Sequence, residues 1–207
     1  MSNRRPHEIG LLGGAFDPVH NGHLEMARAA MKECGLDRVI FIPASISPFK
    51  SSAPRTAARD RLAMLRRALA DQPGCAVSGI ELARGGVSYT VETVRQIQGE
   101  HGPDASLSLI IGMDNLLQIA GWKEIELLIG LCRFIIIARP GCETSRLSGK
   151  NKYWAERIIA RDRGRILPLS IPISSSAVRG AVREGRDLTG LVPPAVAGYI
   201  KEKGLYL

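Results

Sequence analysis

Two histidines three positions apart, His20 and His23, follow a glycine pair at the end of an apolar run. The apolar run from Ile9 to Leu12 predicts a buried strand, and apolar residues at helical spacing after Asn21 predict a helix. Glycines at a strand end let a backbone approach a ligand closely, and the first amides of a helix attract anions. Because residues three apart share one side of a helix, both imidazoles can donate to one anion, with Gly22 leaving room for it. The segment therefore predicts a pocket for phosphates.

Other kinds of site fit the same residues less well. No GxGxxG pattern of dinucleotide-binding oxidoreductases follows the strand, and Gly149-Lys150 lacks the glycine five positions earlier that a P-loop needs. Zinc binding by the two histidines would need a spacing of four or a third ligand. The four cysteines never approach CxxC spacing, so they are interpreted as free, mostly buried thiols. Structural histidines at a helix start stay an alternative to the phosphate pocket.

The elements around this segment alternate between strands and amphipathic helices. The pattern predicts strands over residues 9–12, 39–43, 76–82, 107–111, 134–137 and 166–169. It predicts helices over residues 21–34, 56–70, 89–98, 122–129, 152–160, 175–183 and 194–203. This order favours an α/β protein with a doubly wound, Rossmann-like parallel sheet, in a single domain spanning residues 1–207. Ligands of such sheets bind at the carboxyl ends of the strands where strand order reverses, so the loops after strands 1, 2, 4 and 5 are expected to share a rim.

Composition and charge limit the class of protein further. The chain has 207 residues, of which 45% are hydrophobic and 23% charged, as in soluble globular proteins. The apolar run over residues 134–138 is too short to span a bilayer, and no signal peptide follows the start, so we expect a cytoplasmic protein without a membrane partner. The net charge of +8 is concentrated between Arg139 and Arg165. Because this stretch has just two aromatic residues that could stack on bases, Tyr153 and Trp154, no nucleic-acid partner is expected.

The motifs of the nucleotidyltransferase superfamily have close counterparts in this chain. The segment over residues 13–23 resembles the GxFxPxHxGH signature, and residues 173–179 resemble ISSTxIR. Residues 111–116 are similar to IGxDxL. The branch of nicotinate-nucleotide adenylyltransferases is matched by Ser88-Tyr89-Thr90, by Trp122, by Arg139-Pro140-Gly141 and by the terminal segment over residues 192–200. The resemblance covers essentially the whole chain.

Three positions depart from the family pattern. Ala15 stands where a threonine or serine is common, which removes a hydroxyl near the phosphates, and Ser176 replaces a threonine but keeps the hydroxyl. The family's Pro-Pro-His-Lys stretch is Ser47-Pro48-Phe49-Lys50 in this chain. A histidine expected near the substrate phosphate is therefore missing, whereas Lys50 is retained.

The resemblance implies transfer of the adenylyl group of ATP to nicotinate mononucleotide, giving deamido-NAD and pyrophosphate in NAD biosynthesis. It gives catalytic roles to His20, His23 and Arg179. The implied ATP-binding residues are Gly13, Gly14, Ala15, Phe16, Gly22, Gly112, Asp114, Ser174, Ser175 and Ser176. The implied acceptor-binding residues are Asp17, Lys50, Ser88, Tyr89, Thr90, Trp122 and Arg139. Mg²⁺ is expected to arrive on the triphosphate with few or no protein ligands.

The residue types suit that chemistry independently of the family. The second pKa of a phosphate monoester is about 6, so the attacking oxygen is already ionised at neutral pH and needs no general base. The enzyme has to align the two substrates and neutralise charge on the phosphates, which histidines, an arginine and helix amides do.

Alternatives stay open at single residues and for the whole chain. Trp122 is a candidate core tryptophan, and Asp114 is a candidate helix N-cap. A pantetheine-phosphate type of adenylyltransferase usually has threonine in place of His20 and lacks the Ser-Tyr-Thr and tryptophan pair. A nucleotide sensor without turnover would share the fold but has no need of His20, His23 and Arg179 together. Neither the oligomeric state nor the function of the basic stretch follows from the sequence.

Overall fold

A six-stranded sheet forms the centre of the molecule, with strand order β3-β2-β1-β4-β5-β6 and all neighbouring strands parallel. The computed structural model describes residues 7–49, 54–138, 147–160, 163–169 and 171–207. The strands are β1 (His7–Gly14), β2 (Arg38–Pro43), β3 (Cys75–Val77), β4 (Ala105–Gly112), β5 (Arg133–Ala138) and β6 (Gly164–Pro168). The predicted doubly wound α/β class is therefore confirmed.

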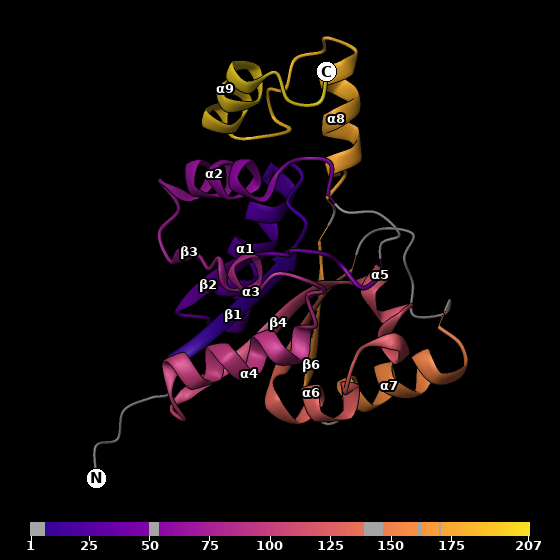
Figure 1. Ribbon diagram of the computed structural model, residues 1–207. Helices are drawn as coiled ribbons and strands as arrows, with labels where there is room; N and C mark the ends of the chain where they lie inside the picture. Colours follow the sequence, from indigo (N-terminus) through magenta and orange to yellow (C-terminus); the bar gives the residue numbers. More distant parts are fainter. Residues whose placement is uncertain (1–6, 50–53, 139–146, 161–162, 170) are drawn as a thin grey trace.

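Helices cover both faces of this sheet (Figure 1). One face carries α1 (Asn21–Cys34), α2 (Ala58–Leu69), α8 (Ser175–Arg183) and α9 (Pro194–Lys203). The other carries α3 (Ile80–Arg84), α4 (Thr90–His101), α5 (Met113–Leu116), the 3₁₀ turn η1 (Ile119–Gly121), α6 (Ile125–Leu131) and α7 (Gly149–Ala160). No helix within the described segments is long and apolar enough to cross a membrane.

Strand β1 shows why the sequences of the strands are continuous apolar runs. Ile9 and Leu11 belong to the core on the α4 side, whereas Leu12 belongs to the core on the α1 side. Gly10 lies between them, and a Cβ at this position would stand 2.7 Å from Leu36 Cδ1. A strand buried on both faces has no polar side to alternate with, so it lacks the period-two pattern of a half-exposed strand.

Two of the predicted elements differ from the observed ones. The strand predicted over residues 76–82 is wrong beyond Val77, because the chain turns at Gly79 and forms α3. The Ser78 hydroxyl accepts the Ile80 amide there at 3.4 Å, and α3 buries its own apolar residues. The helix predicted over residues 122–129 begins only at Ile125, which leaves Trp122 in the connection after η1.

The order of the strands reverses between β1 and β4. The chain first builds β1, β2 and β3 outward on one side, then returns to the other side of β1 with β4 and continues through β5 to β6. Crossovers on opposite sides of β1 and β4 leave their carboxyl ends free of covering connections, so a crevice opens there. The predicted phosphate segment begins at this point, directly after Gly14.

Candidate active site

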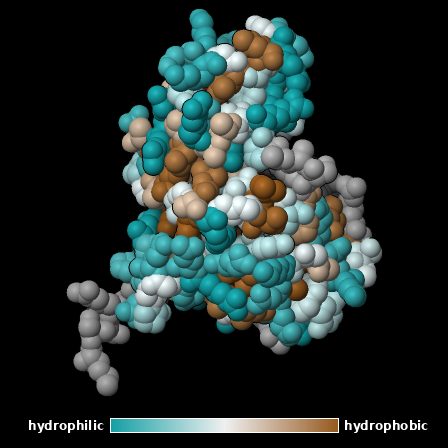
Figure 2. All heavy atoms as spheres, viewed as in Figure 1, coloured by the Kyte–Doolittle hydropathy of each residue, from teal (hydrophilic) through white to brown (hydrophobic). Residues whose placement is uncertain are grey.

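A cavity of about 720 Å³ occupies the crevice at the carboxyl ends of the central strands. The predicted site residues that line it are Gly13, Gly14, Ala15, Phe16, Asp17, His20, His23, Ser88, Thr90, Gly112, Asp114, Trp122, Ser174, Ser175, Ser176 and Arg179. Gly22 and Tyr89 do not line it, and Lys50 and Arg139 lie outside the described residues. On the face shown in Figure 2, hydrophilic residues cover most of the surface and apolar ones gather around its middle.

The two histidines lie side by side at the start of α1, as their spacing predicted. His20 is the N-cap residue and is 3% exposed, and its ring stacks on that of His23 with centroids 3.7 Å apart. The His20 amide donates to His23 Nδ1 at 3.2 Å. Because Nδ1 accepts this hydrogen bond, a neutral His23 ring carries its proton on Nε2. The backbone thereby selects the tautomer in which Nε2 is a donor.

The Phe16 ring packs against the His23 ring. The two rings meet edge-on with centroids 4.9 Å apart, and Phe16 is 1% exposed. The backbone of Phe16 has φ 48°, in the left-handed region that side chains other than glycine rarely adopt. A Cβ on Gly14 would stand 3.2 Å from Phe16 Cζ, so the absence of a side chain at Gly14 accommodates this ring.

Gly22, which was expected at the phosphates, packs closely against the segment that leads from β6 to α8. A Cβ at Gly22 would stand 2.4 Å from Ile171 Cγ2, and Ile171 is a buried residue of the segment that leads from β6 to α8. The space beside Gly22 is therefore filled by protein. The glycine lets α1 approach the second motif of the site closely.

Three side chains hold the carbonyl groups of the loop between β1 and α1. Arg61 of α2 donates to the Ala15 oxygen at 2.7 Å, and Arg179 of α8 donates to the Asp17 oxygen at 2.6 Å. The Ser175 hydroxyl donates to the Pro18 oxygen at 2.9 Å. The loop is thus fixed by residues of two helices, α2 and α8, that are distant from it in the sequence.

Arg61 is a site residue that the sequence reading missed. It is 2% exposed, and burial lowers the pKa of its guanidinium, although the nearby Asp17 carboxylate opposes this effect. Arginine stays protonated at neutral pH even so. A positive charge therefore lies beneath the loop that lines the cavity.

The Asp17 carboxylate has protein partners at both oxygens. Its Oδ2 accepts the Arg55 amide at 2.8 Å, and its Oδ1 accepts the Tyr206 hydroxyl at 2.7 Å. Burial acts to raise the pKa of Asp17, but hydrogen bonds from Thr56, Tyr206 and the Arg55 amide, with the charge of Arg179, bring it below its usual value. This carboxylate holds the loop in place; it was expected to bind the acceptor.

The start of α8 faces the same cavity as α1. Ser174 is the N-cap of α8 and accepts the Ala177 amide at 3.1 Å, while Ser176 accepts a hydrogen bond from Arg179 at 3.1 Å. The serine hydroxyls therefore organise the helix start and Arg179. The guanidinium is held at two of its nitrogens on the cavity wall, which fixes its direction.

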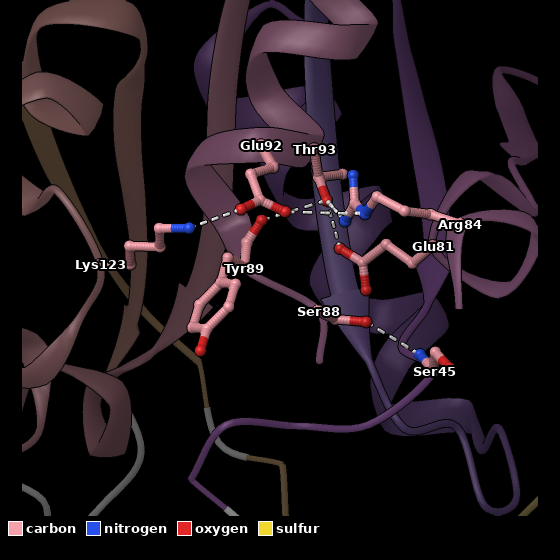
Figure 3. A network of polar contacts seen from close by, with 8 residues as sticks. All are labelled: Ser45, Glu81, Arg84, Ser88, Tyr89, Glu92, Thr93 and Lys123. Atoms are coloured by element: carbon pink, nitrogen blue, oxygen red, sulfur yellow. Dashed lines mark hydrogen bonds and ion pairs between the residues drawn. The ribbon is translucent and has the colours of Figure 1, made fainter. Parts of the chain in front are cut away.

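The opposite end of the cavity is held by a polar network around α3 and α4 (Figure 3). The Ser45 amide donates to Ser88 Oγ at 3.0 Å, which joins the loop after β2 to the Ser-Tyr-Thr segment. Glu81, a buried residue on the cavity wall, accepts the Thr93 hydroxyl at 2.6 Å. Arg84 donates to the same hydroxyl at 2.8 Å. The network positions Thr90 at the first turn of α4.

Tyr89 belongs to the outer part of this network. Its ring lies under the Lys123 ammonium, 4.4 Å from Nζ to the ring centroid, and Lys123 donates to Glu92 at 2.7 Å. That hydrogen bond holds the pKa of Glu92 below its usual value. Tyr89 thus fixes the start of α4 from outside the cavity.

Trp122 both packs against the core and lines the cavity, so core packing is compatible with its predicted contact with the acceptor ring. Its ring faces that of Phe49 with centroids 6.2 Å apart and planes inclined by 30°. Phe49 is the residue that replaces the family histidine, and it adds an apolar wall beside Trp122. Asp114 is exposed on the cavity wall, and the N-cap of α5 is Gly112, so the N-cap interpretation of Asp114 is wrong.

Among the residues with described positions, no three His, Cys, Asp or Glu side chains come together to hold a metal ion. The cavity offers cationic and amide donors at one end and aromatic and hydroxyl groups at the other. This lining suits a polyanionic ligand that carries an aromatic ring. The fold and the lining are those expected of a nucleotide-binding α/β protein.

Comparisons with known proteins agree with that class. Residues 11–181 match the family model described as cytidylyltransferase-like. A probable nicotinate-nucleotide adenylyltransferase of Moorella thermoacetica is 39% identical over 98% of this chain and 93% of its own length. One of Symbiobacterium thermophilum is 42% identical over 96% of this chain and 95% of its own length.

A solved structure of the Plasmodium falciparum nicotinic acid mononucleotide adenylyltransferase, complexed with NaAD, superposes with a TM-score of 0.75. It is 19% identical and covers 96% of this chain and 97% of its own, so it supports the fold. The chain belongs to the cytidylyltransferase-like family and, within it, to the nicotinate-nucleotide adenylyltransferases, as its motifs predicted.

The packing function of Gly22 is tested by Gly22→Ala, with Gly198→Ala as its control. Overpacking against Ile171 is expected to cost about 1–3 kcal/mol and to lower the Tm by several degrees. Gly198 lies inside α9 with open space at its Cβ position, so alanine there is expected to keep or raise the Tm. An unchanged Tm for Gly22→Ala with weaker ATP binding would contradict the packing function.

Proposed function

We propose that the protein transfers the adenylyl group of ATP to nicotinate mononucleotide, giving deamido-NAD and pyrophosphate. The observation that carries this proposal is one cavity with two chemically different ends. His20 and His23 lie at the start of α1 and Arg179 lies within α8, whereas Thr90 begins α4 and Trp122 follows η1. The ends suit a triphosphate and a pyridine ring with a carboxylate.

The phosphate end supplies the charge that adenylyl transfer needs. The attacking phosphate oxygen is ionised at neutral pH, so the protein has to bring it in line with the α-phosphorus and stabilise the leaving pyrophosphate. His23, with its proton on Nε2, and Arg179, fixed by two hydrogen bonds, are preorganised donors for this purpose. Preorganisation avoids the cost of turning donors toward the charge as it develops.

Divalent metal enters this scheme as part of the substrate, MgATP. Mg²⁺ prefers oxygen ligands, keeps several of its waters and binds through few carboxylates together with substrate phosphates. The exposed carboxylate of Asp114 on the cavity wall fits such a hydrated ion. The ion neutralises charge on the triphosphate, while the protein residues orient it.

The acceptor end favours a carboxylate on the pyridine ring. Helix α4 has 12 residues and begins at Thr90, so its unpaired first amides and its positive dipole end face this part of the cavity. An anionic nicotinate ring gains from these amides, whereas a neutral nicotinamide gains less.

Steady-state kinetics of pyrophosphate release with MgATP test the reaction and its acceptor together. The kcat/KM for nicotinate mononucleotide is expected to exceed that for nicotinamide mononucleotide. Equal or higher kcat/KM for the amide would contradict the assigned carboxylate site. Tight binding of both nucleotides without any pyrophosphate release would favour a nucleotide sensor.

Trp122→Ala is expected to raise the KM for the acceptor mononucleotide, because the ring loses its stacking partner. Stacking on an aromatic side chain contributes roughly 1–3 kcal/mol per base, or about 5- to 150-fold in affinity. Trp154→Ala is the matched control, since Trp154 packs on Tyr153 and does not line the cavity. A fall in Tm with an unchanged acceptor KM would make Trp122 a core residue alone.

His23→Ala is expected to lower kcat by roughly 100- to 1000-fold, the usual effect of removing one preorganised donor to a transition-state charge. ATP binding should weaken less than catalysis, because the contact strengthens as charge develops. His101→Ala is the control, since His101 contacts Arg38 away from the cavity. Turnover within about threefold of the parent in a folded His23→Ala protein would remove the catalytic assignment.

A further inference from the structure

The last turn of the chain reaches the active-site loop. Helix α9 ends at Gly204 in the left-handed conformation, and the Leu205 amide donates back to the Ile200 oxygen at 3.0 Å. This reversal brings the Tyr206 hydroxyl to Asp17 Oδ1 at 2.7 Å, across 189 positions of sequence. The ring of Tyr206 is half-buried against the core on the α1 side, which holds the hydroxyl in this place.

Two described arginines, Arg61 and Arg179, lie near the Asp17 carboxylate without donating to its oxygens. Arg179 lies near enough for its charge to lower the pKa of Asp17, and the Asp17 charge acts on Arg61 in turn. Within the described part of the chain, neither guanidinium donates a hydrogen bond to the carboxylate oxygens: Arg61 donates to the Ala15 oxygen, and Arg179 donates to the backbone oxygen of Asp17. Neutral donors occupy the carboxylate instead, namely the Arg55 amide and the hydroxyls of Thr56 and Tyr206.

A buried carboxylate that loses one donor draws the nearest alternative donor toward it, because an unsatisfied charge in a dry site is costly. The cavity-wall cation whose charge acts on Asp17 is Arg179. An ion pair between the two side chains would turn this guanidinium away from Ser176 and from the space above the helix starts. The Tyr206 hydroxyl therefore supplies a hydrogen bond to the Asp17 carboxylate, so that Arg179 is not drawn into an ion pair with it.

We propose that Tyr206 is a positioning residue that reserves Arg179 for the polyphosphate of the nucleotide. Its hydroxyl also fixes Asp17 within the loop that leads to His20, so the end of the chain and the phosphate-binding loop form one unit. The catalytic part of this inference rests on the proposed function, whereas the structural part does not.

The substitution Tyr206→Phe removes the hydroxyl and keeps the ring. Tyr199→Phe is the matched control, because Tyr199 donates to Asp60 at 2.8 Å in the same manner, but Asp60, unlike Asp17, does not line the cavity. A hydrogen bond to a charged group is among the stronger ones, so kcat/KM for ATP is expected to fall roughly 10-fold or more in Tyr206→Phe. The KM for nicotinate mononucleotide should change less than about twofold, and Tyr199→Phe should retain the parent kinetics.

Amide hydrogen exchange over residues 15–20 gives a readout that needs no turnover. Exchange is expected to accelerate there in Tyr206→Phe and to stay as in the parent in Tyr199→Phe. If the parent protein shows no turnover, the proposed function fails. The exchange measurement still decides whether the Tyr206 hydroxyl holds the loop that contains Asp17. Equal exchange and equal kinetics in the two variants would overturn the inference.

A double-mutant cycle with Asp17→Asn tests the part played by Arg179. The amide removes the charge that attracts the guanidinium, so Tyr206→Phe should lower kcat/KM for ATP much less in the Asp17→Asn background than in the parent. Additive losses would overturn this part. If Tyr206→Phe is too unstable to assay, comparison of Asp17→Asn with Asp17→Asn/Tyr206→Phe gives the same test, since a large second loss contradicts the proposal.

Discussion

The loop between β1 and α1 depends on hydrogen bonds from residues that are far away in the sequence. Its carbonyl oxygens at Ala15, Asp17 and Pro18 accept from Arg61, Arg179 and Ser175, respectively. Two guanidinium groups and a single carboxylate, that of Asp17, surround the loop, which leaves excess positive charge beside the crevice. A polyanion in the crevice would compensate this charge, so the interactions that fix the loop also favour the binding of phosphates there.

The acceptor end of the cavity is built by the same principle with different groups. Ser88 accepts the Ser45 amide, and Glu81 of α3 accepts the Thr93 hydroxyl, so the loop after β2 and helix α3 are tied to the start of α4. Both ends therefore use helix starts whose positions are set by side chains of other elements. The reversal of strand order between β1 and β4 brings these helix starts to one crevice.

Much of this arrangement was predictable from the sequence, and the exceptions have physical reasons. The phosphate motifs were found because glycines, histidines and serines at fixed spacing leave a local pattern, and buried strands leave apolar runs. Arg61 was missed because a buried arginine and a solvated one look alike in a helix with several arginines. Tyr206 and Glu81 were missed because their partners are distant in sequence, and the packing of Gly22 was missed because only the fold brings Ile171 beside it.

The backbone at the start of α1 presents His23 as a donor through Nε2, and ¹⁵N NMR of the imidazole nitrogens tests this tautomer directly. The His20 amide donates to Nδ1, so the spectrum of the free protein at neutral pH should have the Nε2–H tautomer at His23. Addition of a non-hydrolysable ATP analogue with Mg²⁺ should shift the Nε2 signal and leave Nδ1 as an acceptor. A neutral ring with its proton on Nδ1, or an Nε2 signal unchanged at saturating analogue, would contradict the account.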